Sequence, residues 1–399
     1  MKLKTLAGLA GLVLISCSSH KEQEEDYNAL IDHSLQRAQV QSLAMAKSLE
    51  DSINQLPRTI NDKGELVTTD SGWWCSGFFP GVLWYLYENS GDEEILKYAE
   101  DYTARVENEK YNTGNHDVGF MLYCSFGNGL RLSGNEDYKE VLLTGANSLS
   151  KRYRPEVGLI RSWDHHADRW KYPVIIDNMM NLELMMWAAE EAQDSTYRNI
   201  SVSHADKTLQ NHFRDDFGSY HVVSYNPKDG TVEKKETFQG YADDSTWARG
   251  EAWGLYGYTM MYRMTQDPKY LDAARNIASF IINNPNMPED GIPYWDFNVP
   301  DIPDAKRDAS AAAIMSSAFI ELSDYVEDPY KKEYLEFAKK QLKTLSSDEY
   351  LAQPGTNGNF ILKHSVGAFP QKSEIDVPLT YADYYFVEAL TRLKKKLKQ

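Results

Sequence analysis

The chain has 399 residues, of which 42% are hydrophobic and 12% aromatic, and it carries a formal net charge of -17. This length and apolar content allow a large buried core. The acidic balance argues against a nucleic-acid partner. Basic residues form a run only at 394–398, which we interpret as a solvated helix end favoured by the helix dipole.

The first residues have the pattern of a targeting segment. Two lysines precede an apolar run over 6–15, and this run leads into Ser16 and Cys17 in the form of a bacterial lipobox. We expect 1–17 to be a lipoprotein signal peptide with Cys17 as the lipidated residue, and 18–26 to be a polar tether. The lipid would hold the protein on the periplasmic side or the outer surface of a Gram-negative bacterium. An ordinary secretory signal is the alternative.

Metal and disulfide signals are weak. Cys75 and Cys124 have no metal-ligand spacing, and we expect them to be small buried residues, although a single bridge between them stays open. The run at 164–168 contains Asp and His but has no matching distant partner. We therefore expect no metal and no cofactor.

Beyond residue 26, segments with the hydrophobic period of a helix recur along the chain. Short turns rich in Gly, Asn, Asp and Pro join most of these segments in pairs. We expect helices over 27–54, 77–89, 93–107, 117–132, 136–152, 177–193, 196–212, 247–265, 268–284, 308–325, 329–346 and 379–397, with short turns at 89–92, 133–135, 193–195, 266–268 and 327–329.

Each short turn makes a helical hairpin, and a similar pattern of Tyr or Leu followed by Ala recurs after it, with a period of roughly 45–70 residues. The first and last helices are left over. If they pair, the ring closes with six hairpins. We therefore predict an all-α, single-domain (α/α)6 barrel over 27–399. An open α-solenoid is the alternative, but it needs polar capping helices, for which the sequence has no strong signature.

The long connections all fall at one end of these hairpins, so they rim one mouth of the ring. Connections of this length are usually functional. Within 213–246, the alternating residues Ser219 to Tyr225 precede a turn at 226–230, which predicts a small hairpin on the rim. The long connections are 55–76, 108–116, 153–176, 213–246, 285–307 and 347–378.

Two carboxylates, Asp117 and Asp177, open successive helices at this mouth. Each can be a helix N-cap. Alternatively, the two can share acid and base work on a sugar, because burial and a neighbouring charge keep one carboxyl protonated. His116 lies beside Asp117 and could orient a carboxyl or contact a reacting group. The pattern alone leaves both interpretations open.

Tryptophans gather in the same connections. Their apolar faces suit the C–H-rich face of a pyranose, so Trp73, Trp74, Trp163 and Trp253 are candidates for sugar stacking. Packing in the core is the alternative for any single one of them.

Arg249 lies four residues before Trp253 on the same helix face. A cation in the first turns of a helix is unfavourable for the dipole and needs a partner. A substrate carboxylate bound by the guanidinium fork is one candidate, and a nearby aspartate such as Asp243 is the other.

Five motifs together resemble one known family, the unsaturated glucuronyl hydrolases of glycoside hydrolase family 88. The resemblance covers nearly the whole chain after the expected signal peptide. It implies an (α/α)6 barrel that acts on oligosaccharides with a 4,5-unsaturated glucuronic acid at the non-reducing end, the product of a polysaccharide lyase. The family hydrates the C4=C5 double bond, and the resulting hemiketal falls apart. The motifs are WWCSGFFPG at 73–81, NHDVGF at 115–120, IIDNMMNLEL at 175–184, QGYADDSTWARGEAW at 239–253 and PLTYADYYFVEAL at 378–390.

The resemblance also implies roles for single residues. Asp177 matches the general acid and base, and Asp117 matches the carboxylate that positions the sugar and stabilises developing charge. Residues that match substrate or water contacts are His116, Trp74, Trp163, His221, Gln239, Arg249 and Trp253.

A segment near the last long connection matches the one that the family uses for sulfate. Ser365 is present, whereas Ala368 and Pro370 depart from the family form, and Lys363 or Lys372 could substitute. We expect a glycosaminoglycan disaccharide from chondroitin, hyaluronan or heparin as substrate. One alternative is a hydrolase of unsaturated rhamnogalacturonyl, ulvan or gellan fragments. Another is a non-catalytic lipoprotein that binds oligosaccharides.

Overall fold

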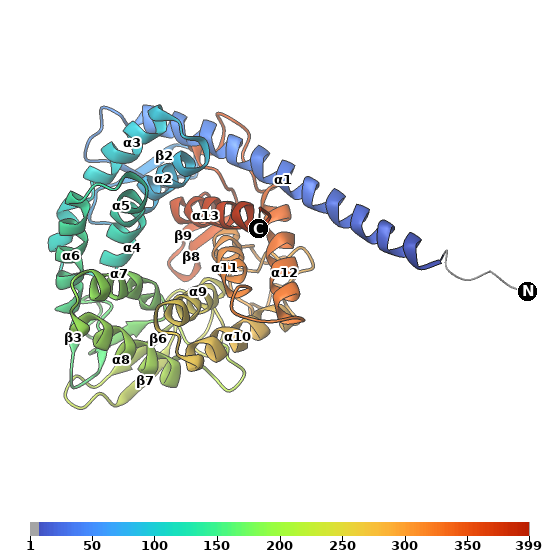
Figure 1. Cartoon of the computed structure of the whole chain (residues 1–399). Helices are drawn as coiled ribbons and strands as arrows, with labels where there is room; N and C mark the ends of the chain where they lie inside the picture. The colour runs from blue at the N-terminus through green and yellow to red at the C-terminus, as the bar shows by residue number, and fades with distance from the viewer. Residues whose placement is uncertain (1–7, 399) are drawn as a thin grey trace, which may run out of the picture.

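An inner ring of helices is enclosed by an outer ring (Figure 1). The computed structural model describes residues 8–398, with side chains from Tyr27 onward. The inner helices are α2 (Phe78–Ser90), α4 (Val118–Leu122) with its continuation α5 (Asn128–Ser133), α7 (Asn178–Glu191), α9 (Ala248–Thr265), α11 (Ala309–Leu322) and α13 (Thr380–Lys396). The outer helices are α1 (Gly8–Ser48), α3 (Glu93–Ala104), α6 (Asp137–Ser150), α8 (Ser195–His212), α10 (Pro268–Asn283) and α12 (Tyr330–Leu345).

The ring is closed. Consecutive inner helices pack on one another, α13 returns to α2, and α1 packs on both α2 and α13. The first and last helices therefore complete the sixth hairpin, and the predicted all-α (α/α)6 barrel is confirmed. The mouth, defined here as the end where the inner helices begin, carries the long connections.

Residue type explains which helices lie inside. Every residue of α11 is buried, whereas α10 buries one stripe that includes Tyr270, Ala274 and Ile277. The short turns supply helix caps, because the side chains of Asp92, Asp194 and Asp267 accept hydrogen bonds from the N–H groups two residues ahead.

Two expectations about helix limits are wrong. The expected helix over 117–132 is interrupted by a π-helical turn at Tyr123–Gly127. The first helix runs from Gly8 to Ser48 instead of over 27–54, so α1 continues through the expected tether, extends beyond the ring (Figure 1) and ends earlier than expected. Residues 18–26 contain no proline and several good helix formers, and their polarity alone does not end a helix.

The expected signal peptide lies partly outside the described residues, which begin at Gly8, and so does the side chain of Cys17. Within the described part of the chain, no helix combines the length and apolarity that a membrane span requires. Cys75 and Cys124 are both buried and free, so they do not form a bridge.

Small antiparallel sheets line the mouth. The predicted rim hairpin is confirmed as β6 and β7, but the sequence did not predict that β5 joins it. The other strand pairs were also not predicted. The pairs are β1 (Leu56–Ile60) with β2 (Leu66–Thr69), β3 (Tyr153–Arg154) with β4 (Leu159–Ile160), β5 (Pro173–Ile175) with β6 (Val222–Tyr225) and β7 (Val232–Glu236), and β8 (Ser365–Ala368) with β9 (Ser373–Val377).

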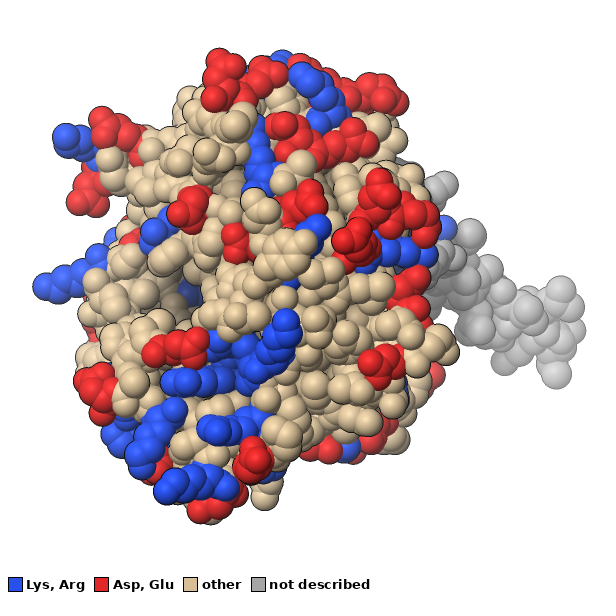
Figure 2. Space-filling view, turned by 90° about the vertical axis from the view of Figure 1, so that its left-hand side faces the viewer, with Lys and Arg blue, Asp and Glu red and all other residues tan. Residues whose placement is uncertain are grey.

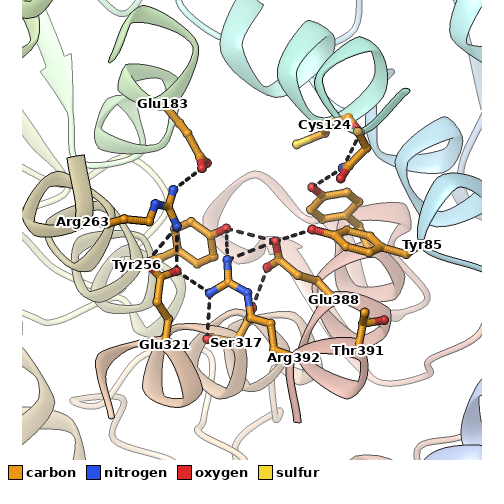
Figure 3. Close-up of polar contacts among 12 residues, drawn as sticks. Tyr85, Cys124, Glu183, Tyr256, Arg263, Ser317, Glu321, Glu388, Thr391 and Arg392 are labelled. Atoms are coloured by element: carbon orange, nitrogen blue, oxygen red, sulfur yellow. Dashed lines mark hydrogen bonds and ion pairs between the residues drawn. The ribbon is translucent and has the colours of Figure 1, made fainter. Parts of the chain in front are cut away.

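The opposite half of the barrel holds a charged network between inner helices (Figure 3). Arg263 of α9 bonds Glu321 of α11 at 2.8 Å and also bonds Glu183 of α7. Arg392 of α13 bonds Glu321 at 2.6 Å and approaches Glu388 at 3.4 Å. We call these five residues the far-end network. It joins α7, α9, α11 and α13 by paired charges.

Candidate active site

A pocket opens at the mouth and encloses about 370 Å³ of space, including its opening to solvent. Most of the side chains expected to carry chemistry line it, although they come from connections far apart in the sequence. The lining residues are Trp74, His116, Asp117, Trp163, Ile175, Asp177, Gln239 and Arg249.

A larger cavity, of about 1090 Å³, lies deeper in the ring and is bordered by part of the far-end network. Its charged groups already bond one another, as in the contact between Arg263 and Glu183. The mouth pocket instead contains buried polar atoms without partners among the described residues. Because a ligand can satisfy such atoms, the mouth pocket is the candidate active site.

The two aspartates meet in this pocket. Asp117 directly precedes α4 and Asp177 directly precedes α7, but neither side chain makes a capping hydrogen bond. Both residues are buried, at 8% and 9% exposure. The alternative that they serve as helix caps is therefore wrong.

Burial dominates the electrostatics of the pair. It raises the pKa of Asp177 to about 7, although the charge of Arg249 opposes the rise. Burial also raises the pKa of Asp117, and the charge of Asp177 raises it further. A carboxyl with such a pKa holds a proton near neutral pH and can donate it.

A neutral imidazole accompanies each carboxyl. The Nε2 atom of His116 lies 3.4 Å from Oδ1 of Asp117, and burial lowers the pKa of His116 to about 3. The Nε2 atom of His221 lies 3.7 Å from Oδ2 of Asp177, and burial lowers the pKa of His221 well below its ordinary value. Neither ring therefore brings a positive charge to the carboxyls.

Arg249 is fully buried in the first turn of α9 and lines the pocket. It pairs with Asp308 at 3.2 Å and bonds the backbone carbonyls of Val366 and Gly367. Its protein partner is thus Asp308 and not Asp243, which we had considered from the sequence. Because Asp308 offsets its charge, Arg249 is a weaker cation for a substrate carboxylate than the sequence suggested.

The four tryptophans divide into three groups. Trp74 and Trp163 line the pocket. Trp73 lies on the rim with the guanidinium of Arg58 stacked 4.2 Å from its ring, and it does not line the pocket. Trp253 is fully buried, so the expectation that its face stacks on a sugar is wrong. Its buried indole N–H has no hydrogen-bond partner among the described residues, but it lies close enough to Asp177 to lower the pKa of that carboxyl slightly against the larger effect of burial.

Two further expected residues occupy the last rim segments. Gln239 lines the pocket, and its side-chain amide donates to the carbonyl of Gly367 at 3.3 Å. Ser365 is buried in β8 outside the pocket lining, and its hydroxyl has no partner among the described residues. Lys363, a candidate sulfate contact, donates to the carbonyl of Asp348 at 2.8 Å.

Sequence analysis missed three supporting residues. Asn181 of α7 accepts a hydrogen bond from the N–H of Phe120 at 2.8 Å, which fixes α7 against α4 next to Asp117. Asn178 donates to the carbonyl of Ile160 at 2.9 Å. Asp308 anchors Arg249. Asn178 and Asn181 are two amides in an otherwise apolar, Met- and Leu-rich helix, and this contrast is the sequence signal that could have identified them.

The run at 164–168 has a structural role. Asp164 pairs with Arg152 at 2.9 Å and with Arg161 at 3.2 Å. In the described part of the chain, no three His, Cys, Asp or Glu residues gather in a way that could hold a metal ion.

Basic residues gather beside the mouth despite the acidic composition. Segments 151–171 and 228–236 contain nine Lys and Arg against six Asp and Glu. The turn at Gly230 packs on Glu156 and Val157, so the two segments are in contact. Figure 2 shows Lys and Arg side chains gathered on the side of the molecule where β3 and β7 lie in Figure 1. We call this region the basic surface. It supplies a local field that favours anionic ligands.

Comparisons with known proteins identify the family of the chain. The family model described as Glycosyl Hydrolase Family 88 matches residues 45–396. An unsaturated glucuronyl hydrolase from Formosa agariphila is 45% identical over 98% of this chain and 98% of its own length. An unsaturated chondroitin disaccharide hydrolase from Streptococcus pyogenes is 30% identical over 93% of this chain and 92% of its own.

A solved structure gives the same result. The crystal structure of an unsaturated glucuronyl hydrolase specific for heparin superposes with a TM-score of 0.90 and 47% identity, and the match covers 93% of this chain and 99% of that one. With the fold and the paired carboxyls in place, these matches show that the chain belongs to glycosyl hydrolase family 88 and is a glycoside hydrolase.

Proposed function

We propose that this enzyme releases 4,5-unsaturated glucuronic acid from the non-reducing end of glycosaminoglycan oligosaccharides that a lyase has produced. The single observation that carries the proposal is the pair Asp117 and Asp177, two buried carboxyls that line one pocket without capping their helices. The relatives named above as glucuronyl and chondroitin disaccharide hydrolases support the substrate class.

The proposed reaction is the hydration of an enol ether. Protonated Asp177 gives its proton to C4, and positive charge develops at C5 and the ring oxygen. Asp117 stabilises that charge. Water then bonds to C5 and gives a proton to Asp177, which restores the acid. The product is a hemiketal that opens and releases the neighbouring sugar.

Geometry alone also allows an ordinary inverting glycosidase, because both mechanisms use two carboxyls. Family membership favours hydration. Both mechanisms need a protonated acid, and the neutral state of His116 and His221 leaves Asp177 without a neighbouring imidazolium charge that would hold it ionised.

Loss of ultraviolet absorbance tests the proposal, because hydration destroys the conjugated double bond. The enzyme is incubated with lyase digests of chondroitin, hyaluronan, heparin and ulvan. Decay on a glycosaminoglycan digest supports the proposal, and its rate ranks the substrates. Decay only on the ulvan digest assigns the alternative substrate class.

The basic surface and Ser365 bear on sulfated substrates. The basic surface favours anionic oligosaccharides beside the mouth, and one structural relative is specific for heparin. Against this, Ala368 and Pro370 differ from the family segment associated with sulfate. We propose that sulfated disaccharides are accepted without being required. Matched sulfated and unsulfated chondroitin disaccharides in the same assay test this directly.

We further propose that the protein is a lipoprotein anchored through Cys17. The support is the order of charged start, apolar run and Ser16-Cys17 in the sequence. Labelling of expressing cells with a clickable fatty acid is expected to mark the wild-type protein and not a Cys17→Ala variant. Equal labelling of the wild-type protein and the Cys17→Ala variant would contradict lipidation at Cys17.

A further inference from the structure

One three-stranded sheet brings together the residues around Asp177. In this antiparallel sheet Ile175 pairs with Val222, and Val222 pairs with Glu236. The end of β5, the start of β6 and the end of β7 therefore meet at one edge. Asp177 follows β5, and His221 directly precedes β6. Phe238 and Gln239 follow β7.

The His221 ring is held on one side by backbone groups. Its Nδ1 atom accepts hydrogen bonds from the N–H of Phe238 at 3.0 Å and from the N–H of Gln239 at 3.1 Å. The ring lies against Trp247, with 4.7 Å between ring centroids. The carbonyl of His221 accepts from the N–H of Ile176, next to Asp177, at 3.2 Å. Ring and carboxyl are thus fixed relative to each other by the sheet.

The other ring nitrogen faces the proposed acid. Nε2 of His221 lies 3.7 Å from Oδ2 of Asp177. Both atoms are buried, and neither has a hydrogen-bond partner among the described residues. Asp177 lines the pocket, and its Oδ1 is not among the buried atoms that lack a partner, so we infer that Oδ1 is the oxygen that faces the pocket.

The backbone contacts decide where the ring proton lies. A nitrogen that accepts from two N–H groups offers its lone pair and cannot carry a hydrogen. In a neutral imidazole the proton must then be on Nε2. Turning the ring over would place a C–H group against both N–H donors and leave them unsatisfied, which is costly for buried backbone groups.

We propose that the backbone N–H groups of Phe238 and Gln239 lock His221 in its Nε2–H form, and that this N–H holds Oδ2 of Asp177 so that only Oδ1 exchanges protons with the substrate. His221 is then a positioning residue. Given the proposed function, Oδ1 gives its proton to C4 and regains one from the water that bonds to C5. His221 keeps its own proton throughout.

Nitrogen NMR tests the lock without any substrate. In protein labelled with ¹⁵N-histidine, the His221 ring is assigned by the signal that disappears in His221→Asn. We expect an unprotonated Nδ1 and a protonated Nε2, unchanged across the pH range in which the protein stays folded. A proton on Nδ1, or a ring that becomes doubly protonated near neutral pH, would overturn the proposal. Because this readout needs no turnover, it stands apart from the proposed function.

Two matched variants test the positioning role. The amide of His221→Gln places an N–H donor near the position of Nε2 but cannot accept from Phe238 and Gln239. His221→Asn does the reverse, with an acceptor near Nδ1 and no donor toward Asp177. We expect the Gln variant to keep a turnover number roughly tenfold or more above that of the Asn variant, the size of a hydrogen bond to a charged group.

A purely structural role for His221 gives the opposite order, because Asn keeps the bonds to the rim segment. Equal turnover, or higher turnover in the Asn variant, would therefore overturn the proposal. Thermal melts of both proteins confirm that folded enzymes are compared. Wild-type decay of absorbance on the same disaccharide separately tests the proposed function.

Discussion

The two ends of the barrel treat buried charge in opposite ways. In the far-end network the carboxylates bond arginines, and Arg392 and Arg263 hold the pKa of Glu321 below its ordinary value although burial opposes them. Glu183, which bonds Arg263 alone, differs from Glu321, because burial raises its pKa. At the mouth, Asp177 faces a neutral imidazole and its pKa is raised to about 7.

This difference assigns the far end of the barrel a structural role and the mouth a functional one. Paired buried charges bond each other and are not free to bind a ligand. At the mouth, buried polar atoms lack hydrogen-bond partners, which lowers the stability of the fold. A substrate can then supply the missing contacts. Mutations at the far end should therefore change the free energy of unfolding, and mutations at the mouth should change turnover.

The largest expected effect is on turnover at the mouth. Asp177→Asn keeps the shape of the side chain and removes its titrating proton. We expect turnover to fall by roughly three orders of magnitude or more, measured as loss of absorbance of an unsaturated disaccharide. The thermal midpoint should not fall. Near-normal turnover would show that Asp177 has no catalytic role.

Mutation of the far-end network should lower stability and leave turnover nearly unchanged. Arg392→Met leaves Glu388 without its cation, and we expect a loss of about 3 kcal/mol in the free energy of unfolding, as for other broken buried pairs. Turnover per folded molecule should stay within about twofold of wild type, since charge pairing there is structural. Urea titrations and the absorbance assay measure the two quantities.

Lys394→Met is the matched control for this variant, because Lys394 lies on α13 like Arg392 but bonds the exposed Asp32 of α1 at the surface. Its loss should cost under about 1 kcal/mol. If both variants lose the same stability, the buried network has no special role.

The raised pKa of Asp177 predicts a pH-dependent stability difference. A carboxyl whose pKa is higher in the folded state binds more protons there than in the unfolded chain, so wild-type stability falls as the pH rises from about 4 towards the folded value of about 7. Asn cannot ionise. We expect Asp177→Asn to match wild type near pH 4 and to exceed it at pH 8 by roughly 4 kcal/mol. A difference that does not change with pH would contradict the raised pKa.

The smallest expected effect concerns the basic surface. Arg154→Gln should lower kcat/KM for a sulfated disaccharide by about twofold at low ionic strength, and the effect should fade near 0.15 M salt because exposed charges are screened. Lys332→Gln removes the same charge from α12, an outer helix, and should change nothing. Equal effects of the two variants would show that total charge, and not the basic surface, steers the substrate.

Most of the ring was predictable from the sequence, because hydrophobic period and turn residues are local. The aspartates that cap helices after short turns, such as Asp267, signal their hairpins directly. The first and last helices could be paired because the five short turns join the other ten helices into hairpins and leave only these two. The start of helix α1 differs from the prediction because polar residues that favour helices continue a helix as well as apolar ones do.

Long-range pairing was not predictable. Strand β5 has only three residues and no usable period, so nothing indicated that it would join β6 and place His221 beside Asp177. Asp308 lies far along the chain from Arg249, and only closure of the ring brings them together. The burial of Trp253 and the basic surface depend on the same closure.

The most direct measurement is a titration of the Asp177 carboxyl by ¹³C NMR, in protein labelled at aspartate and compared with Asp177→Asn for assignment. The account predicts that the wild-type signal titrates near pH 7. A signal that titrates near the ordinary aspartate value of about 4 would contradict it, because the mouth would then hold no proton to give.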